Sequence, residues 1–100
     1  MQFVIIGRNG SDPEVPATRE RVRPAHLDGL KKLCEGGHVI SAGPILTEEG
    51  APNGSFLIFD FPTRADLDAY LANEPYATAH VWKDIEIIPC KAGFIDNKMV

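Results

Sequence analysis

The stretch SFLIFDF, residues 55–61, is apolar at almost every position. A strand with one face in water alternates apolar and polar side chains, whereas a strand covered on both faces does not. The segment FVII, residues 3–6, has the same character and is ended by Gly7. We therefore expect both segments to be central strands of one sheet.

A helix is expected between these two strands. Leucines recur at helical spacing over residues 27–33, and the two glycines that follow Glu35 end the pattern. Pro24 suits the first turn of a helix, where its missing N–H costs nothing. Residues 8–18 carry Asn-Gly, Asp-Pro and two prolines, so we expect a long loop there, of the kind that often covers a ligand site.

The rest of the chain supplies two edge strands and a second helix. Residues 38–46 predict a strand that bends at Gly43-Pro44, and residues 82–89 alternate as an edge strand does. A helix is expected over residues 63–73, with Thr63 as its N-cap, followed by a turn or short helix. The order strand–helix–strand–strand–helix–strand indicates an α+β, ferredoxin-like fold with a four-stranded antiparallel sheet. We expect one domain over residues 1–100, with residues 91–100 as a C-terminal tail.

Two helices can cover only one face of such a sheet, although the central strands are apolar on both. Apolar side chains left in water would form a larger patch than monomers usually expose. We expect a second copy to cover the open face, which makes the protein a homodimer. The alternative is that the tail folds back over this face.

Composition narrows the class of partner. The net charge is −4 with no lysine or arginine stripe, which argues against a nucleic-acid partner. The opening MQFVIIGRNG lacks the pattern of a signal peptide, and no apolar run reaches membrane length, so we expect no membrane partner. Cys34 and Cys90 form no CxxC pair, and we interpret them as reduced, buried thiols of a cytoplasmic protein.

His26 lies on the inward stripe of the first predicted helix. With about 100° per residue, Leu30 falls at about 40° and Leu33 at about −20° from it. One interpretation is a core histidine bonded to a backbone carbonyl. The other is a general base in a pocket, because imidazole suits proton transfer near neutral pH.

Five segments in order carry a resemblance to a known family: RPAHL (23–27), AGPIL (42–46), GSFLIFDF (54–61), EPYATAHVW (74–82) and IEIIP (85–89). Together they resemble the YciI-like (YCII domain) family. The resemblance implies the dimeric α+β barrel type of ferredoxin-like fold. It also implies a histidine–carboxylate pair in a pocket, which would be His26 and Glu74 here, with glutamate where the family has aspartate.

The same resemblance suggests a function. The family includes a dehydrochlorinase that acts on a chlorinated hydroxyhydroquinone. It implies a cofactor-free enzyme doing acid/base chemistry on a small cyclic or aromatic molecule, by elimination, isomerisation or hydrolysis. The alternative is a non-catalytic module that binds a small molecule or a protein partner.

Six further residues are candidates for binding the small-molecule ligand: Arg23, Gly43, Pro44, Ser55, Tyr76 and His80. Arg23 suits an anionic group, or else pairs with a neighbouring acid. Gly43 and Pro44 would shape the pocket wall, and Tyr76 either donates a hydrogen bond or only packs. His80 stands where many members of the family that this chain resembles have glycine, and it would either crowd the pocket or add a second titratable group. We expect no metal site, since the histidines lack metal spacing, and no nucleotide fingerprint indicates a cofactor.

Overall fold

The computed structural model describes all residues, 1–100. In chain order the elements are β1 (Gln2–Asn9), α1 (Val15–Glu35), β2 (Val39–Leu46), β3 (Pro52–Asp60), α2 (Arg64–Leu71), α3 (Pro75–Thr78), β4 (Trp82–Cys90), β5 (Phe94–Ile95) and β6 (Lys98–Met99). The main sheet has the order β2-β3-β1-β4, and every neighbouring pair is antiparallel. The predicted ferredoxin-like arrangement, with β1 and β3 at the centre, is confirmed.

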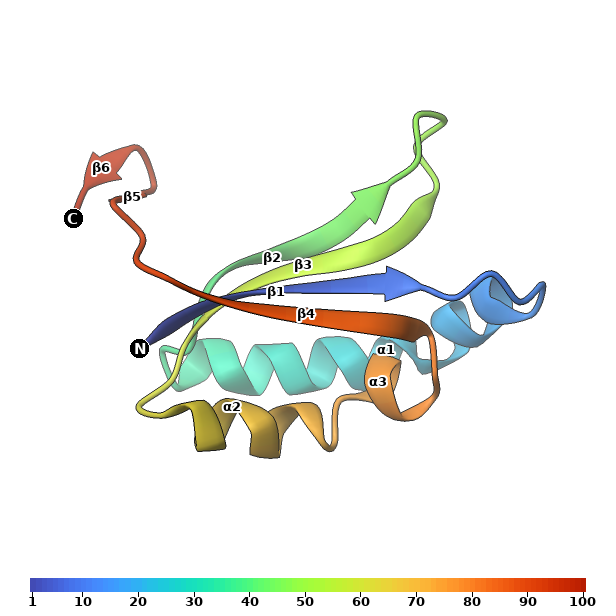
Figure 1. Cartoon of the computed structure of the whole chain (residues 1–100), viewed down its shortest axis with the longest axis horizontal. Coiled ribbons are helices and arrows are strands. Elements are labelled where there is room, and N and C mark those ends of the chain that lie inside the picture. Colours follow the sequence, from blue (N-terminus) through green and yellow to red (C-terminus); the bar gives the residue numbers. More distant parts are fainter.

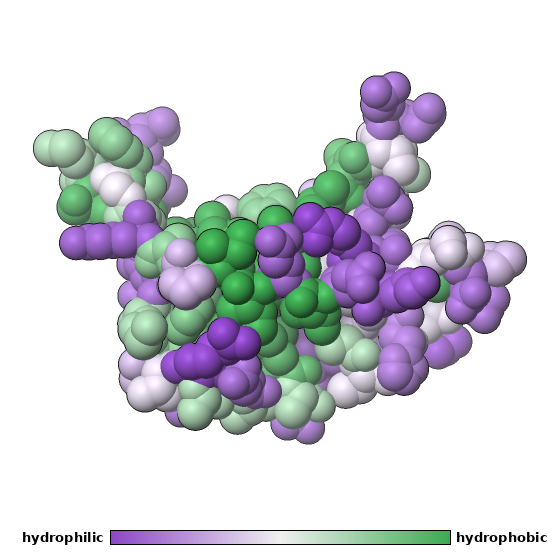
Figure 2. Space-filling view, in the orientation of Figure 1, coloured by the Kyte–Doolittle hydropathy of each residue, from purple (hydrophilic) through white to green (hydrophobic).

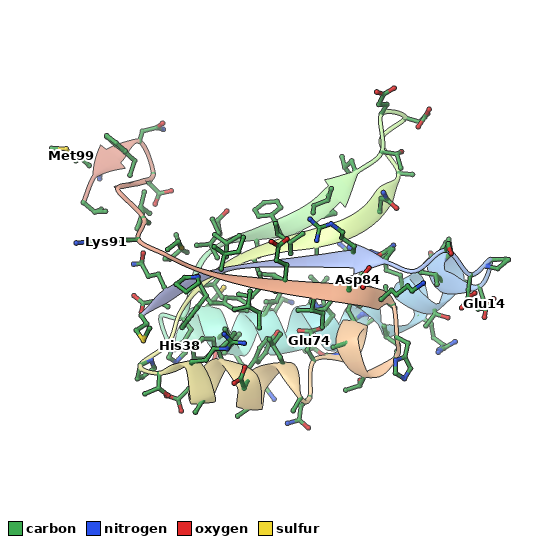
Figure 3. The ribbon with its side chains drawn as sticks, in the orientation of Figure 1. Glu14, His38, Glu74, Asp84, Lys91 and Met99 are labelled. Atoms are coloured by element: carbon green, nitrogen blue, oxygen red, sulfur yellow. The ribbon has the colours of Figure 1, made fainter.

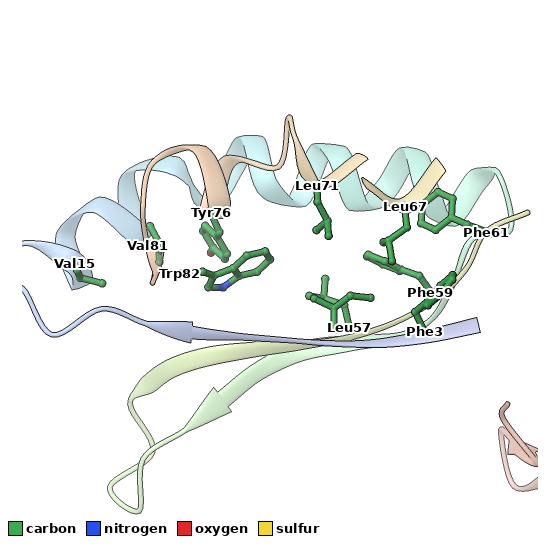
Figure 4. Packing of buried hydrophobic residues seen from close by; sticks show 11 residues of the cluster. Phe3, Val15, Leu57, Phe59, Phe61, Leu67, Leu71, Tyr76, Val81 and Trp82 are labelled. Carbon is green, nitrogen blue, oxygen red and sulfur yellow. The ribbon is translucent and has the colours of Figure 1, made fainter. Parts of the chain in front are cut away.

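All three helices lie on one side of the sheet (Figure 1). The strand register explains which side chains face them. Ile5 pairs with Leu57 and Phe3 with Phe59, and all four are buried beneath the helices. Figure 4 shows this core as a layer between the sheet and the helices, with Tyr76 and Trp82 next to each other toward the Val15 end. That end of the layer holds the candidate site.

The other face of the sheet is also apolar. The half-buried Val4 pairs with Ile58 on one side and with Ile88 on the other, and Ile6 pairs with Phe56. Figure 2 shows hydrophobic residues gathered at the middle of the molecule, between two projecting arms. One arm is the β2–β3 hairpin and the other is the β5–β6 hairpin (Figure 1).

The tail forms a structure that the sequence did not predict. β5 and β6 pair with each other, and their hairpin stands away from the sheet (Figure 1). Phe94 is 72% exposed and Met99 80% exposed, so neither packs on the apolar face. The alternative in which the tail folds back over that face is therefore wrong.

Helix α1 is longer than expected. It begins at Val15, places Pro16 in its first turn and carries Pro24 inside. The predicted loop over residues 8–18 shrinks to a short connection, because β1 continues to Asn9. An interior proline removes one backbone hydrogen bond, and this 21-residue helix carries Pro24 at an exposed position.

The prediction for the cap of α2 is confirmed, whereas the prediction for the two cysteines is wrong. Thr63 caps α2 by accepting from the Asp66 N–H at 3.2 Å, as predicted. Cys34 is exposed and Cys90 half-buried, so the expectation of buried thiols is wrong. No helix of this chain is both long enough and apolar enough to cross a membrane.

Candidate active site

His26 occupies the inner face of α1 and is only 6% exposed. Its Nδ1 lies 2.6 Å from Oε1 of Glu74, 48 residues further along the chain. Its ring stacks on Tyr76, with 3.9 Å between the centroids and 15° between the planes. The structure therefore confirms the inward direction that the helical phase predicted for His26, and it places the ring beside Glu74, the carboxylate that the family resemblance implied.

Glu74 is held in place by the local sequence. A residue before proline favours extended backbone, and Glu74 has φ −69° and ψ 122° directly before Pro75. Its carboxylate caps α3 by accepting from the Tyr76 N–H at 3.1 Å. The side chain is fully buried, and Figure 3 places Glu74 in the helical layer below the sheet.

A third donor completes the shell of this carboxylate. The Tyr70 hydroxyl, one helical turn earlier on α2, donates to Glu74 Oε2. Burial raises the pKa of the Tyr70 phenol, and its hydrogen bond to the Glu74 carboxylate raises that pKa further. Tyr70 therefore stays protonated at neutral pH and remains a donor to Glu74.

The hydrogen bonds define the state of His26. A carboxylate only accepts, so the bond to Glu74 places a proton on Nδ1 and leaves Nε2 with its lone pair in the neutral ring. Nε2 makes no hydrogen bond within the chain, yet no fully buried side-chain nitrogen or oxygen lacks a partner. Nε2 is therefore accessible to solvent.

Solvent reaches His26 through a cavity of about 640 Å³ that lies between α1 and the β2–β3 half of the sheet. Ligand pockets for small molecules commonly have such a volume. His26 lines it together with the predicted residues Arg23, Gly43, Pro44, Ser55 and Tyr76. Glu74 does not line the cavity and lies behind the histidine.

Arg23 and Tyr76 are two of the side chains of the cavity lining that were predicted from the sequence to contact a ligand. Arg23 is exposed and forms no salt bridge, which leaves its guanidinium free beside the cavity. Tyr76 is buried and packs on His26, and burial raises the pKa of its phenol against the opposing charges of Arg19 and Arg23. Tyr76 therefore combines the packing role with a place in the cavity wall.

His80 is not part of this pocket. It lies with Trp82 and Lys83 at a separate hollow of about 250 Å³. Its backbone is left-handed, with φ 58°, in the turn between α3 and β4, and its side chain is exposed. The expectation that His80 lines the substrate pocket is corrected, because this turn directs it elsewhere.

The structure adds Arg19, which the sequence analysis missed. Arg19 is 9% exposed, and its guanidinium lies 4.5 Å from the centroid of Tyr76. It precedes His26 by seven residues, so both lie on one helix face. This spacing was the available signal, but Pro24 resembles a helix start, which leaves Arg19 before the expected helix.

Comparison with known proteins agrees with this architecture. Residues 1–91 match the YCII-related domain. Protein YciI of Escherichia coli and Protein YciI of Shigella flexneri are each 31% identical to this chain over 100 residues, covering 94% of it and 100% of the relative.

Solved structures show the same fold. The 5-chloro-2-hydroxyhydroquinone dehydrochlorinase of Burkholderia phenoliruptrix, in complex with 2,5-dihydroxybenzoquinone, matches with a TM-score of 0.79 and 24% identity, over 93% of this chain and 96% of that one. An antibiotic biosynthesis monooxygenase matches with a TM-score of 0.54 and 21% identity, over 92% of this chain and 98% of that one. From the domain match and the identity to YciI, the chain belongs to the family of YCII-related domains.

Proposed function

We propose that this protein is a cofactor-free enzyme that uses His26 for acid/base chemistry on a small cyclic or aromatic molecule. The observation that carries the proposal is the 2.6 Å contact between His26 Nδ1 and a fully buried Glu74 carboxylate, with Nε2 left accessible. A neutral imidazole fixed in one tautomer is the arrangement that a general base requires.

The proposed reaction begins when Nε2 removes a proton from a hydroxyl or acidic carbon of the substrate. The electron pair of the broken O–H or C–H bond stays on the substrate, and Glu74 stabilises the imidazolium that forms. Expulsion of a leaving group then completes an elimination, and return of the proton to another atom completes an isomerisation. Activation of a water by the same nitrogen would give hydrolysis.

Two further features support this class of substrate. The cavity is lined by aromatic and aliphatic side chains as well as Arg23, which suits a small ring with an acidic oxygen. The solved dehydrochlorinase of the same fold binds a dihydroxybenzoquinone. We propose a comparable ring as ligand here, in a cytoplasmic homodimer.

A turnover assay tests the proposal. Wild type and variants are offered chlorinated and unchlorinated hydroxyhydroquinones and cyclic enol lactones, with chloride release and ring absorbance as readouts. His26→Ala should lower turnover by about 10²- to 10⁴-fold, the usual contribution of a general base, and Glu74→Gln should also lower it.

His38→Ala is the matched control, because His38 binds the Asp60 carbonyl at 2.8 Å, outside the cavity lining. It should keep the wild-type rate. A His26→Ala variant that turns over substrate as fast as wild type would contradict the proposal. Binding of these rings without turnover by the wild type would favour the non-catalytic binding module instead.

A further inference from the structure

Arg19 is a buried cation without an anionic partner. Its three hydrogen bonds go to neutral acceptors: Asn9 Oδ1 at 2.9 Å, the Gly54 carbonyl at 3.0 Å and Ser55 Oγ at 3.0 Å. No carboxylate forms a salt bridge with it. Because a buried charge is poorly screened, this guanidinium makes the adjoining end of the cavity electropositive.

Ser55 occupies that end of the cavity and is only 2% exposed. Its Oγ accepts one hydrogen bond from Arg19 at 3.0 Å and a second from Trp82 Nε1 at 3.1 Å. Guanidinium and indole groups donate only, and a hydroxyl oxygen has two lone pairs. Both lone pairs are therefore occupied, and the hydroxyl proton of Ser55 can only be donated.

The chain provides no acceptor for that proton. Every side-chain hydrogen bond that involves Ser55 is one that its oxygen accepts. Since Ser55 lines the cavity, a bound molecule can supply the missing acceptor. A buried donor without a partner costs free energy, so this position favours a ligand that brings one.

The packing of Gly7 and Trp82 keeps the Ser55 oxygen occupied as an acceptor, so that its hydroxyl proton remains available for donation. Ser55 on β3 pairs with Gly7 on β1. A Cβ at Gly7 would lie 2.4 Å from the Trp82 ring, so only glycine lets the indole lie over β1 and reach the serine. Three strands and α1 thus converge on one hydroxyl.

We propose that Ser55 donates its proton to a negatively charged oxygen of the ligand, a phenolate or enolate, and that Arg19 acts as its positioning residue. The inference concerns the same pocket as the proposed function and names its ligand class, but it requires binding only. It assigns the charged oxygen to the Ser55 end and leaves His26 Nε2 for the atom that exchanges a proton.

Binding of two matched probes tests this assignment. 4-Nitrophenolate and the neutral 4-nitroanisole have nearly the same shape, and both are titrated by calorimetry at a pH at which the phenol is ionised. Wild type should bind the phenolate about ten- to a hundredfold more tightly, as expected for a hydrogen bond to a charged group. The hydrogen bond should also shift the absorbance of the bound phenolate to shorter wavelength.

Variants then locate the donor. Ser55→Ala should lose most of the preference, because only the more distant charge of Arg19 remains, and it should lose the absorbance shift while binding 4-nitroanisole as before. Ser55→Thr, which keeps a hydroxyl, should retain both. Ser41→Ala, at an exposed position of β2, is the matched control and should behave as wild type.

Several results would overturn the proposal. They are equal wild-type affinity for the two probes, no binding of the phenolate, or a Ser55→Ala variant that is folded by thermal melting and keeps the preference. The wild-type comparison holds even if Ser55→Ala does not fold. His26→Ala should retain the phenolate preference, so a failure of the catalytic proposal is distinguishable from a failure of this one.

Discussion

At the scale of single residues, Glu74 connects the three helices of the site. It accepts from His26, from Tyr70 and from the Tyr76 N–H, so one carboxylate joins α1, α2 and α3. The sequence allowed the pair with His26 to be predicted from a resemblance and a helical phase. Tyr70 could not be predicted, because its role depends on where α2 ends relative to α3.

The raised pKa of Tyr70 makes a prediction about stability. Since the folded state holds this proton more tightly than the unfolded chain, its contribution is complete below the ordinary tyrosine pKa of about 10. Above that pH the unfolded chain loses the proton first, so the free energy of unfolding falls as pH rises. The slope from this one group approaches about 1.4 kcal/mol per pH unit.

Tyr70→Phe should remove that slope while costing about 1–3 kcal/mol at neutral pH, through the lost hydrogen bond to Glu74. Urea unfolding at a series of pH values from neutral to alkaline measures both effects. Identical slopes above pH of about 10 in the two proteins would show that Tyr70 does not titrate in this way.

At the scale of elements, α1 decides which residues reach the cavity. Its inner face carries Arg19 and His26, seven residues apart, and both are buried. The inward direction of His26 was predictable because it needed only the local phase. Arg19 was missed because Pro24 resembles a helix start, whereas Pro16 is the proline in the first turn. His80 was misplaced because a left-handed turn residue cannot be derived from periodicity.

The interior proline can be tested directly. Pro24 is exposed, so its replacement loses little packing and restores a backbone donor to α1. Pro24→Ala should raise the free energy of unfolding by about 1–2 kcal/mol, after allowing for the greater freedom of the unfolded chain.

Pro16→Ala, in the first turn, is the control and should change stability by less than about 0.5–1 kcal/mol. Chemical denaturation of the three proteins gives the comparison. A destabilised Pro24→Ala variant would contradict this expectation and would mean that the proline itself supports the packing of α1 on the sheet.

At the scale of the whole molecule, the sheet is apolar on both faces but carries helices on one. This much followed from the sequence, because residues 3–6 and 55–61 lack polar alternation. What covers the second face depends on association, which the pattern of one chain does not contain. The exposed hairpin of β5 and β6 was also beyond prediction, since two-residue strands leave almost no periodic signal.

We predict a homodimer formed through the open face. Wild type should sediment at twice the monomer mass at micromolar concentration, because pairing would bury the patch around Ile6 and Ile58. Ile58→Lys should shift the protein to monomer by placing a charge in this apolar patch, opposite Val4 and Ser41. Ala69→Lys, at an exposed position of α2, is the control and should remain dimeric. A wild-type protein that sediments only as monomer would exclude the dimer.

The state of the His26 ring tests the central claim most directly. ¹⁵N NMR of the wild-type protein, at a pH where the ring is neutral, distinguishes a protonated ring nitrogen from one with a free lone pair. The contact with Glu74 predicts a proton on Nδ1 and a bare Nε2. Addition of a ligand should then move mainly the Nε2 resonance. A neutral ring protonated on Nε2, with Nδ1 bare, would contradict the assignment of His26 as the base.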